Sequence, residues 1–316
     1  MSVFLVCLAA LLLDRLVGEP RVLHPLMGFG WLTMQFEVRA RRPGFTGWLL
    51  GGLGVLLLAG IPALVAGLAW LFLQGPALWA LEALVLWLAI GLRSLREHAL
   101  AVADPLVRGD IAAAREAVAM LVSRDGQALD ESGIAVAATE SSLENGADAV
   151  FASLFWFVLA GLPGLVLHRL VNTLDAMWGY RTRDYADFGH VAARLDDLLN
   201  WLPARLTALS YALAGSPKRA LSCWWQQAGA WSSPNAGPVM AAGAGALGLR
   251  LGGPAAYHGR MVERPWLGQG AAPTGADIHR ALALIHRALG FWLLAILLGG
   301  VITWLNPFGL PSMAGG

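Results

Sequence analysis

Apolar stretches alternate with polar blocks along the chain, and several of the apolar stretches are as long as membrane-crossing helices. The runs at residues 47–73 and 149–171 exceed the roughly 20 residues that a helix needs to span a bilayer, and the runs at 77–92 and 291–304 are expected to cross as well. Residues 2–13 are too few for a full span and lack the features of a signal peptide, so we expect a retained tilted or partial span. The pattern predicts an all-α, polytopic membrane protein with about four to six membrane segments.

The runs at residues 47–73 and 77–92 are expected to form a helical hairpin. Gln74, Gly75 and Pro76 form an uncharged turn between them, and arginines lie at both open ends. Cytoplasmic loops of membrane proteins carry an excess of Lys and Arg, so these ends are predicted to face the cytoplasm. The arginines are Arg39, Arg41 and Arg42 before the hairpin and Arg93 and Arg96 after it.

The run at residues 149–171 contains a break, Gly161-Leu-Pro-Gly164. A single straight span would place the polar segments before and after it on opposite sides of the membrane. A broken or re-entrant helix would keep both on one side, as the charge bias favours. We therefore expect the broken or re-entrant form.

Composition agrees with a membrane protein and excludes several function classes. Hydrophobic residues make up 57% of the 316 residues and charged residues 14%, against roughly 25% charged in ordinary globular proteins. The net charge of +1 gives no reason to expect a nucleic-acid partner. Cys7 and Cys223 lie far apart in apolar surroundings, so neither a disulfide framework nor a thiolate metal site is expected. We expect one membrane-embedded catalytic domain over residues 1–316.

Four polar segments are the candidate contributors to a site that faces the cytoplasm: residues 14–30, 93–148, 172–205 and 215–288. In the first, Asp14 and His24 lie in a Gly- and Pro-rich stretch. Polar irregular backbone near a membrane is tolerated only where protein or a water-filled cavity covers it, which makes both residues site candidates. A juxtamembrane loop is the alternative, and it suits the later arginines better than it suits Asp14.

In the second segment, three acids are spaced four residues apart on a predicted helix, Glu140, Glu144 and Asp148, with Asn145 beside them. This spacing places them along one face with a drift of about 40° per step. A solvated acidic stripe is the alternative. Because the helix continues into the apolar run at 149, we expect the acids at the membrane surface beside the third segment.

The third segment is the densest polar block of the chain. Asn172 and Asp175 are three residues apart, and Asp196 and Asn200 are four apart with Asp197 adjacent. Carboxylate and amide oxygens on facing helices suit Mg²⁺, which takes one or two carboxylates together with substrate phosphates. Further candidates in this block are Arg194 and Arg205, which could neutralise the acids or hold phosphate, and Tyr180, which could stack or hydrogen-bond.

The fourth segment contains patterns with structural explanations. Gly243, Gly245 and Gly248 spell G-x-G-x-x-G, but no strand precedes them, so helix packing is the expected role. His279 and His286 share a helix face without a third ligand and are expected to be packing or surface residues.

Six motifs in order carry a resemblance to a known family. They are D-R-x-x-G-E-P with H-P-x-x-x-G (14–30), S-R-D (123–125), E-S-x-x-E-N-x-x-D (140–148), N-T-x-D-x-M-x-G-Y (172–180), R-x-D-D-x-x-N-x-x-P-A-R (194–205) and S-P-N-A-G (233–237). Over nearly its whole length the chain resembles the adenosylcobinamide-phosphate synthase family of cobalamin biosynthesis (CobD/CbiB).

The resemblance implies a bacterial inner-membrane enzyme that uses ATP and Mg²⁺ to join aminopropanol, or its O-phosphate, to the corrinoid adenosylcobyric acid. Other enzymes of that pathway are possible partners, besides membrane lipid. The candidate roles that follow are these: catalysis by Glu140, Glu144, Asp197 or His24; Mg²⁺ binding by Glu144, Asp148, Asp175, Asp196 and Asp197; and substrate or phosphate binding by Arg124, Asn145, Asn172, Tyr180, Arg194, Asn200, Arg205 and Asn235.

Two other functions compete with this one. A membrane prenyl- or phosphatidyl-transferase would also hold a Mg²⁺-diphosphate between acids on facing helices, and Asp196-Asp197-x-x-Asn200 partly imitates such a motif. A transporter is the third possibility, because transporters often contain broken helices.

Overall fold

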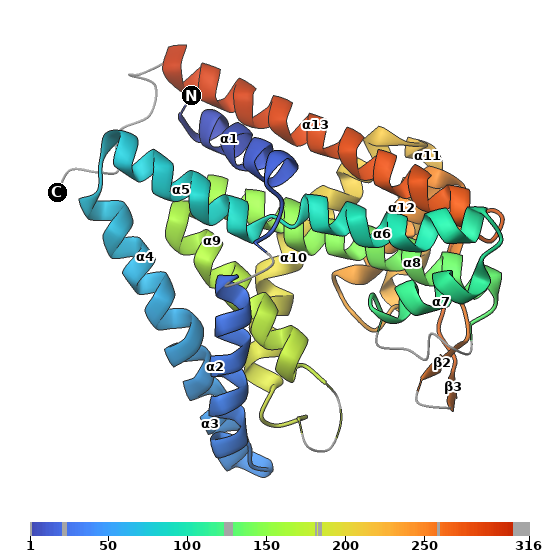
Figure 1. The fold of residues 1–316 in the computed structure, drawn as a ribbon, viewed down its shortest axis with the longest axis horizontal. Helices are drawn as coiled ribbons and strands as arrows, with labels where there is room; N and C mark the ends of the chain where they lie inside the picture. Colours follow the sequence, from blue (N-terminus) through green and yellow to red (C-terminus); the bar gives the residue numbers. More distant parts are fainter. Residues whose placement is uncertain are drawn as a thin grey trace.

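A computed structural model describes residues 2–20, 24–122, 129–180, 182, 185–257 and 260–305 of the chain. Its helices, drawn in Figure 1, are α1 (Ser2–Leu16), α2 (Pro25–Ala40), α3 (Gly44–Val55), α4 (Ile61–Phe72), α5 (Gly75–Ala89), α6 (Leu92–Val107), α7 (Ile111–Ala119), α8 (Glu131–Asn145), α9 (Ala152–Trp178), α10 (His190–Ala214), α11 (Pro217–Gln227), α12 (Ala236–Leu247) and α13 (Gly275–Leu305). Two π-helical segments, η1 (Leu56–Gly60) and η3 (Gly146–Phe151), and the 3₁₀ turn η4 (Ala228–Ala230) connect some of them.

The described residues contain four helical segments that are long and apolar enough to cross a membrane. They are Gly44–Phe72, Gly75–Val107, Glu131–Trp178 and Gly275–Leu305. Large apolar side chains cover their outer surface, and Phe72 is 81% exposed. Such exposure is costly in water and expected in lipid. The predicted polytopic all-α architecture is confirmed.

The predicted hairpin consists of α3–η1–α4 and α5. Gly75 adopts a φ of +61° at the turn, and Pro76 occupies the first turn of α5, where its missing N–H costs nothing. Pro62 is the second residue of α4, just after the π-helical segment η1, so the ladder of backbone hydrogen bonds is already irregular where the proline enters it.

Helix α9 is broken at Gly161, as the sequence predicted. Gly161 has φ +61° and ψ −150°, a conformation that is essentially restricted to glycine. A straight helix would separate Asp148 from Asn172 by about 36 Å at 1.5 Å per residue. Both residues nevertheless line one cavity. The chain therefore turns back at Gly161, and the polar segments on either side of the break lie together.

Short helix α1 packs against α5, α6 and α13, and Figure 1 shows it alongside α13. The side chains of Cys7 and Ala10 are fully buried in that contact, whereas Leu5 and Leu12 are exposed. Fifteen residues at 1.5 Å each give about 22 Å, less than the roughly 30 Å of a bilayer core. The helix thus has the dimensions of the partial span that the sequence suggested.

Two short antiparallel hairpins were not predicted from the sequence. Strands β1 (Arg250–Gly252) and β4 (Trp266–Gly268) pair with Leu251 opposite Leu267, and β2 (Ala255–Tyr257) pairs with β3 (Arg260–Val262). Three-residue strands fall below the length at which alternation is recognisable.

The glycine motif that precedes the hairpins packs helices closely. A Cβ at Gly243 would lie 2.8 Å from Leu143, and one at Gly245 would lie 2.8 Å from the Ala220 backbone. The expected packing role of this motif is therefore confirmed.

Candidate active site

A cavity of about 490 Å³ lies between five parts of the fold. They are the N-terminal part of α6, the α8–η3 junction, α9, α10 and the turn before α12. The cavity is lined by most of the predicted site residues: Glu144, Asn145, Asp148, Asn172, Asp175, Asp196, Asp197, Asn200 and Asn235. The volume is within the usual range for a small-molecule site, roughly 300 to 1,000 Å³. The predicted convergence of oxygen-rich side chains from separate helices is thus present in the structure.

Helix α8 delivers Glu144 and Asn145, and η3 delivers Asp148. Asp130 begins this helix by accepting the backbone N–H of Gly133 at 2.7 Å, which satisfies one of the free donors at its N-terminus. The Asn145 side-chain amide donates to Ser141 Oγ at 2.9 Å, which fixes its orientation beside the cavity. The change to π-helical winding at Gly146 then rotates Asp148 relative to a regular helix.

Glu140 does not line the cavity, which corrects the expected common face of the three acids. Its carboxylate accepts two hydrogen bonds from the Arg264 guanidinium, at 3.1 and 3.2 Å, and one from the backbone N–H of Gly252 at 2.7 Å. Residues four apart on a helix differ in direction by about 40°, so Glu140 points away from the cavity and toward the β1–β4 hairpin. The Glu140 side chain is 7% exposed, and Arg264 neutralises its charge. This position supports a structural role for Glu140 and does not support the predicted catalytic role.

Helices α9 and α10 hold the other carboxylates through an amide network. Asp196 Oδ1 accepts a hydrogen bond from Asn172 Nδ2 at 3.1 Å and one from Asn200 Nδ2 at 3.0 Å. Burial raises the pKa of Asp196, and the adjacent Asp197 raises it further, while the two amide hydrogen bonds act in the opposite direction. A cation near Asp196 would offset this cost of ionisation.

The network continues to a buried histidine that the sequence analysis missed. His168 is fully buried, and its Nε2 lies 2.9 Å from Asn200 Oδ1. Because Asn200 donates through its nitrogen to Asp196, its oxygen must accept, and His168 must carry its proton on Nε2. His168 thus orients Asn200, which in turn orients Asp196.

Arg169 is the one arginine among the described residues that lines this cavity, and the sequence analysis did not single it out. It donates to Asn172 Oδ1 at 3.3 Å, while its buried Nε has no hydrogen-bond partner among the described residues. A buried donor without a partner is unusual and is a candidate contact for a substrate oxygen.

Two of the arginines predicted as phosphate ligands, Arg194 and Arg205, do not line the cavity. Arg194 is exposed and does not line the cavity, because two residues along a helix correspond to about 200° and turn it away from Asp196. Arg205 donates to Asn235 Oδ1 at 3.2 Å and to the carbonyl of Pro234 at 3.3 Å. It therefore secures the turn from which Asn235 donates to the Asp197 carbonyl at 2.9 Å.

Three other predicted residues do not reach the cavity or cannot be placed. His24 caps α2: its Nδ1 accepts the backbone N–H of Leu26 at 3.1 Å, and burial lowers its pKa. Tyr180 is 52% exposed and contacts Tyr185 edge-on, outside the cavity lining. Arg124 lies outside the described residues.

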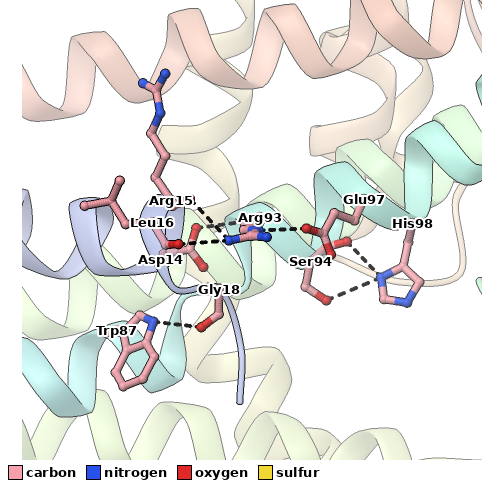
Figure 2. Close-up of polar contacts among 9 residues, drawn as sticks. All are labelled: Asp14, Arg15, Leu16, Gly18, Trp87, Arg93, Ser94, Glu97 and His98. Atoms are coloured by element: carbon pink, nitrogen blue, oxygen red, sulfur yellow. Dashed lines mark hydrogen bonds and ion pairs between the residues drawn. The ribbon is translucent and has the colours of Figure 1, made fainter. Parts of the chain in front are cut away.

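Near α6 the cavity is lined by Glu19, which lies in the first motif but was not given a role, and by Ser94 and His98, which the sequence analysis left out. His98 Nδ1 lies 2.8 Å from the Ser94 carbonyl, a contact drawn in Figure 2. A carbonyl can only accept, so Nδ1 carries the proton and Nε2 keeps its lone pair. The spacing Ser94-x-x-x-His98 was the available signal, because residues four apart share a helix face.

The lining suits a hard, oxygen-seeking cation. No three His, Cys, Asp or Glu side chains within the described ranges form a ready-made metal cluster. Mg²⁺ does not require one, since it is commonly bound by one or two carboxylates and completed by substrate phosphates and water. Asp148, Asp175, Asp196 and Asp197 offer such carboxylates around one cavity.

Comparison with known proteins identifies the family of the chain. The model of the CobD/Cbib protein family matches residues 7–285. The chain belongs to the CobD/CbiB family. A cobalamin biosynthesis protein CobD from Stutzerimonas stutzeri is 56% identical over 306 residues, covering 96% of this chain and 99% of the relative. One from Chromobacterium violaceum is 52% identical, with 92% and 96% covered. No solved structure matches the chain significantly.

Membership of the CobD/CbiB family places the chain in cobalamin biosynthesis and confirms the resemblance drawn from the six motifs. Five of those motifs contribute residues to the cavity: Glu19 comes from the first, Glu144 and Asp148 from the third, Asn172 and Asp175 from the fourth, Asp196, Asp197 and Asn200 from the fifth, and Ser233 and Asn235 from the last. The remaining motif, S-R-D, lies outside the described residues.

Proposed function

We propose that this chain is an ATP-dependent amide synthase of cobalamin biosynthesis. It joins (R)-1-amino-2-propanol, or its O-phosphate, to a carboxylate of adenosylcobyric acid and yields adenosylcobinamide or its phosphate. Family membership supports the pathway and the corrinoid substrate. The observation that carries the proposal is the convergence of six carboxylates on one cavity beside Arg169, since phosphoryl transfer depends on positioning and charge neutralisation.

The proposed reaction has two steps. The corrinoid carboxylate first receives the γ-phosphoryl group of ATP, which gives an acyl phosphate and ADP. The amine nitrogen then attacks the acyl carbon, a C–N bond forms, the C–O bond to the phosphoryl group breaks, and inorganic phosphate leaves. The attacking nitrogen loses a proton, which requires a base within hydrogen-bond reach.

His98 is the base that the geometry favours, in place of His24. Its Nε2 keeps a lone pair because Nδ1 donates to the Ser94 carbonyl, and its side chain lines the cavity. Glu144 and Asp197 line the cavity as well and are the remaining candidates from the sequence. His24 uses Nδ1 to cap α2 and is not part of the lining.

Mg²⁺, when bound, would neutralise charge on the nucleotide phosphates. Asp148, Asp175, Asp196 and Asp197, with Glu144, are the residues proposed to hold it. Arg169 is proposed to hold a phosphoryl or carboxylate oxygen, because its buried Nε lacks a partner among the described residues.

The site is proposed to face the cytoplasm from the bacterial inner membrane. The arginines at the open ends of the α4–α5 hairpin support this orientation by the positive-inside rule. ATP is available on that side. The turn between α4 and α5, at Gln74, would then face the opposite compartment.

Mass spectrometry of the product tests the proposal. Purified protein is given adenosylcobyric acid, ATP, Mg²⁺ and either amine, and we expect a product heavier by the amine less one water, with one ADP formed per product. Asp197→Asn is expected to lower the rate at least 100-fold, whereas Asp110→Asn, at the N-terminus of α7, serves as a matched control. Product formation without ATP would favour a transferase. Uptake of unchanged substrate into liposomes would favour a transporter.

A further inference from the structure

A second cavity, of about 720 Å³, lies between α1, α6 and α13 and shares no lining residue with the candidate active site. Leucines of all three helices form its apolar part. Its polar part consists of Asp14, Arg15, Arg93, Arg96, Glu97 and His286. We call it the α1–α6–α13 groove. No step of the proposed reaction uses it.

All three helices change from apolar to charged at the groove. In α1 the apolar run ends at Leu13 and is followed by Asp14 and Arg15, and in α6 Arg93 follows the apolar α5. In α13 the order is reversed, with His286-Arg287 preceding an apolar stretch that continues to the end of the helix. The groove therefore straddles the level at which the apolar membrane interior meets the headgroups.

The charges in the groove suit one phosphodiester. Three arginines face two carboxylates, which leaves one net positive charge when Asp14 is ionised. Arg93 is engaged by Glu97 at 2.7 Å and by the carbonyls of Arg15 and Leu16, as Figure 2 shows. Arg15 and Arg96 are exposed, and in Figure 2 the Arg15 side chain extends away from this network.

The carboxylate of Asp14 can accept a further hydrogen bond in the groove. Its side chain is 1% exposed, and Oδ2 accepts the backbone N–H of Arg93 at 2.9 Å. Oδ1 is buried and has no partner among the described residues. Buried acceptors are rarely left unpaired, so a hydroxyl group of a bound molecule would complete this site.

We propose that the α1–α6–α13 groove binds an anionic phospholipid whose headgroup carries hydroxyls, with phosphatidylglycerol as the matching chemistry. Arg15 and Arg96 contact the phosphate, and Asp14 accepts a hydrogen bond from a headgroup hydroxyl. One acyl chain lies along Leu8 and Leu12 of α1 and Leu293 of α13. The other acyl chain remains in the bilayer.

Native mass spectrometry of the full chain in detergent tests the proposal, with phosphatidylglycerol and phosphatidylcholine of equal chain length titrated separately. Wild-type protein is expected to retain phosphatidylglycerol at least tenfold more tightly. The pair Arg15→Gln and Arg96→Gln is expected to lose about fivefold per arginine, the usual contribution of a basic residue at an anionic membrane surface. Leu12→Trp, which narrows the apolar part, is expected to weaken binding of the diacyl lipid as well.

The matched control removes two exposed arginines outside the groove, Arg108→Gln and Arg287→Gln. An equal loss in this control would show general charge attraction and overturn the proposal. Equal retention of the two lipids would do the same, as would binding of glycerol 3-phosphate as tightly as the diacyl lipid. The unfolding temperatures of all variants are measured in parallel. The result for the Arg15 and Arg96 variants is used only if their unfolding temperatures agree with that of wild type. If they do not agree, the binding loss in Leu12→Trp provides the independent test.

Discussion

At the scale of single residues, the tautomer of His98 follows from one hydrogen bond. The Ser94 carbonyl holds the proton on Nδ1 and leaves Nε2 with a lone pair. His98→Ala is expected to lower the rate of amide formation by 10²- to 10⁴-fold, the usual contribution of a positioned base. Steady-state rates with saturating ATP measure this. His190→Ala, at an exposed histidine that lines neither the active site nor the α1–α6–α13 groove, is the control, and an unchanged rate for His98→Ala would assign the proton to Glu144 or Asp197.

His24 makes stability depend on pH. Burial lowers its pKa below the usual value near 6.5, so the folded state favours the neutral ring. As the pH falls through that value, the unfolded chain takes up the proton first and stability is lost. Protonation at Nδ1 would also remove the cap of α2.

His24→Asn keeps a capping acceptor and removes the titration. We expect its unfolding temperature to change less than that of wild type between pH 7.5 and pH 5.5. His24→Ala should cost about 1 kcal/mol at pH 7.5 through the lost cap. Equal pH dependence of wild type and His24→Asn would contradict this account.

At the scale of elements, Glu140 links α8 to the hairpin of β1 and β4 through Arg264 and the Gly252 backbone. Breaking a buried ion pair from one side costs about 3 to 5 kcal/mol, because the remaining charge stays buried. Glu140→Gln is therefore expected to lower the unfolding temperature while the folded fraction keeps its turnover per molecule. Glu144→Gln should do the reverse. Loss of turnover in fully folded Glu140→Gln protein would return this residue to the catalytic set.

The break in α9 depends on one glycine. A Cβ at Gly161 would lie 2.9 Å from the Trp70 ring, in a backbone conformation that other residues rarely adopt. Such backbone strain alone costs about 1 to 3 kcal/mol. Gly161→Ala should thus destabilise the protein clearly in thermal unfolding, whereas Gly299→Ala in α13, where a Cβ would have no neighbour within 4 Å, should not. Equal unfolding temperatures would show that α9 tolerates a continuous helix.

At the scale of the whole molecule, the turn at Gly161 sets the topology. Because Asp148 and Asp175, on either side of the break, line one cavity, the segments before and after the break should be reached from the same side of the membrane, at position 131 and at position 182. A membrane-impermeant maleimide on vesicles of known orientation should label Glu131→Cys and Thr182→Cys together, and Gln74→Cys from the other side. Labelling of positions 131 and 182 from opposite sides would contradict the turn. Cys7 and Cys223 are buried and should contribute little background.

The sequence alone determined the helical membrane architecture, the hairpin, the break at Gly161 and the segments that supply the site, because hydrophobic run length, Gly and Pro placement and local spacing are properties of neighbouring residues. Side chains such as Asn172 and Asp175, or Asp196 and Asn200, were correctly placed together for the same reason.

Only the tertiary structure decided which polar side chain faces which partner. Helical spacing gives the relative direction of two residues on one helix and leaves the absolute direction open. Glu140 was expected beside Glu144, yet it pairs with Arg264, 124 positions away. His98 and Arg169 reach the cavity, while Arg194 points away from it, because the packing of α6, α9 and α10 sets the rotation of each helix about its own axis.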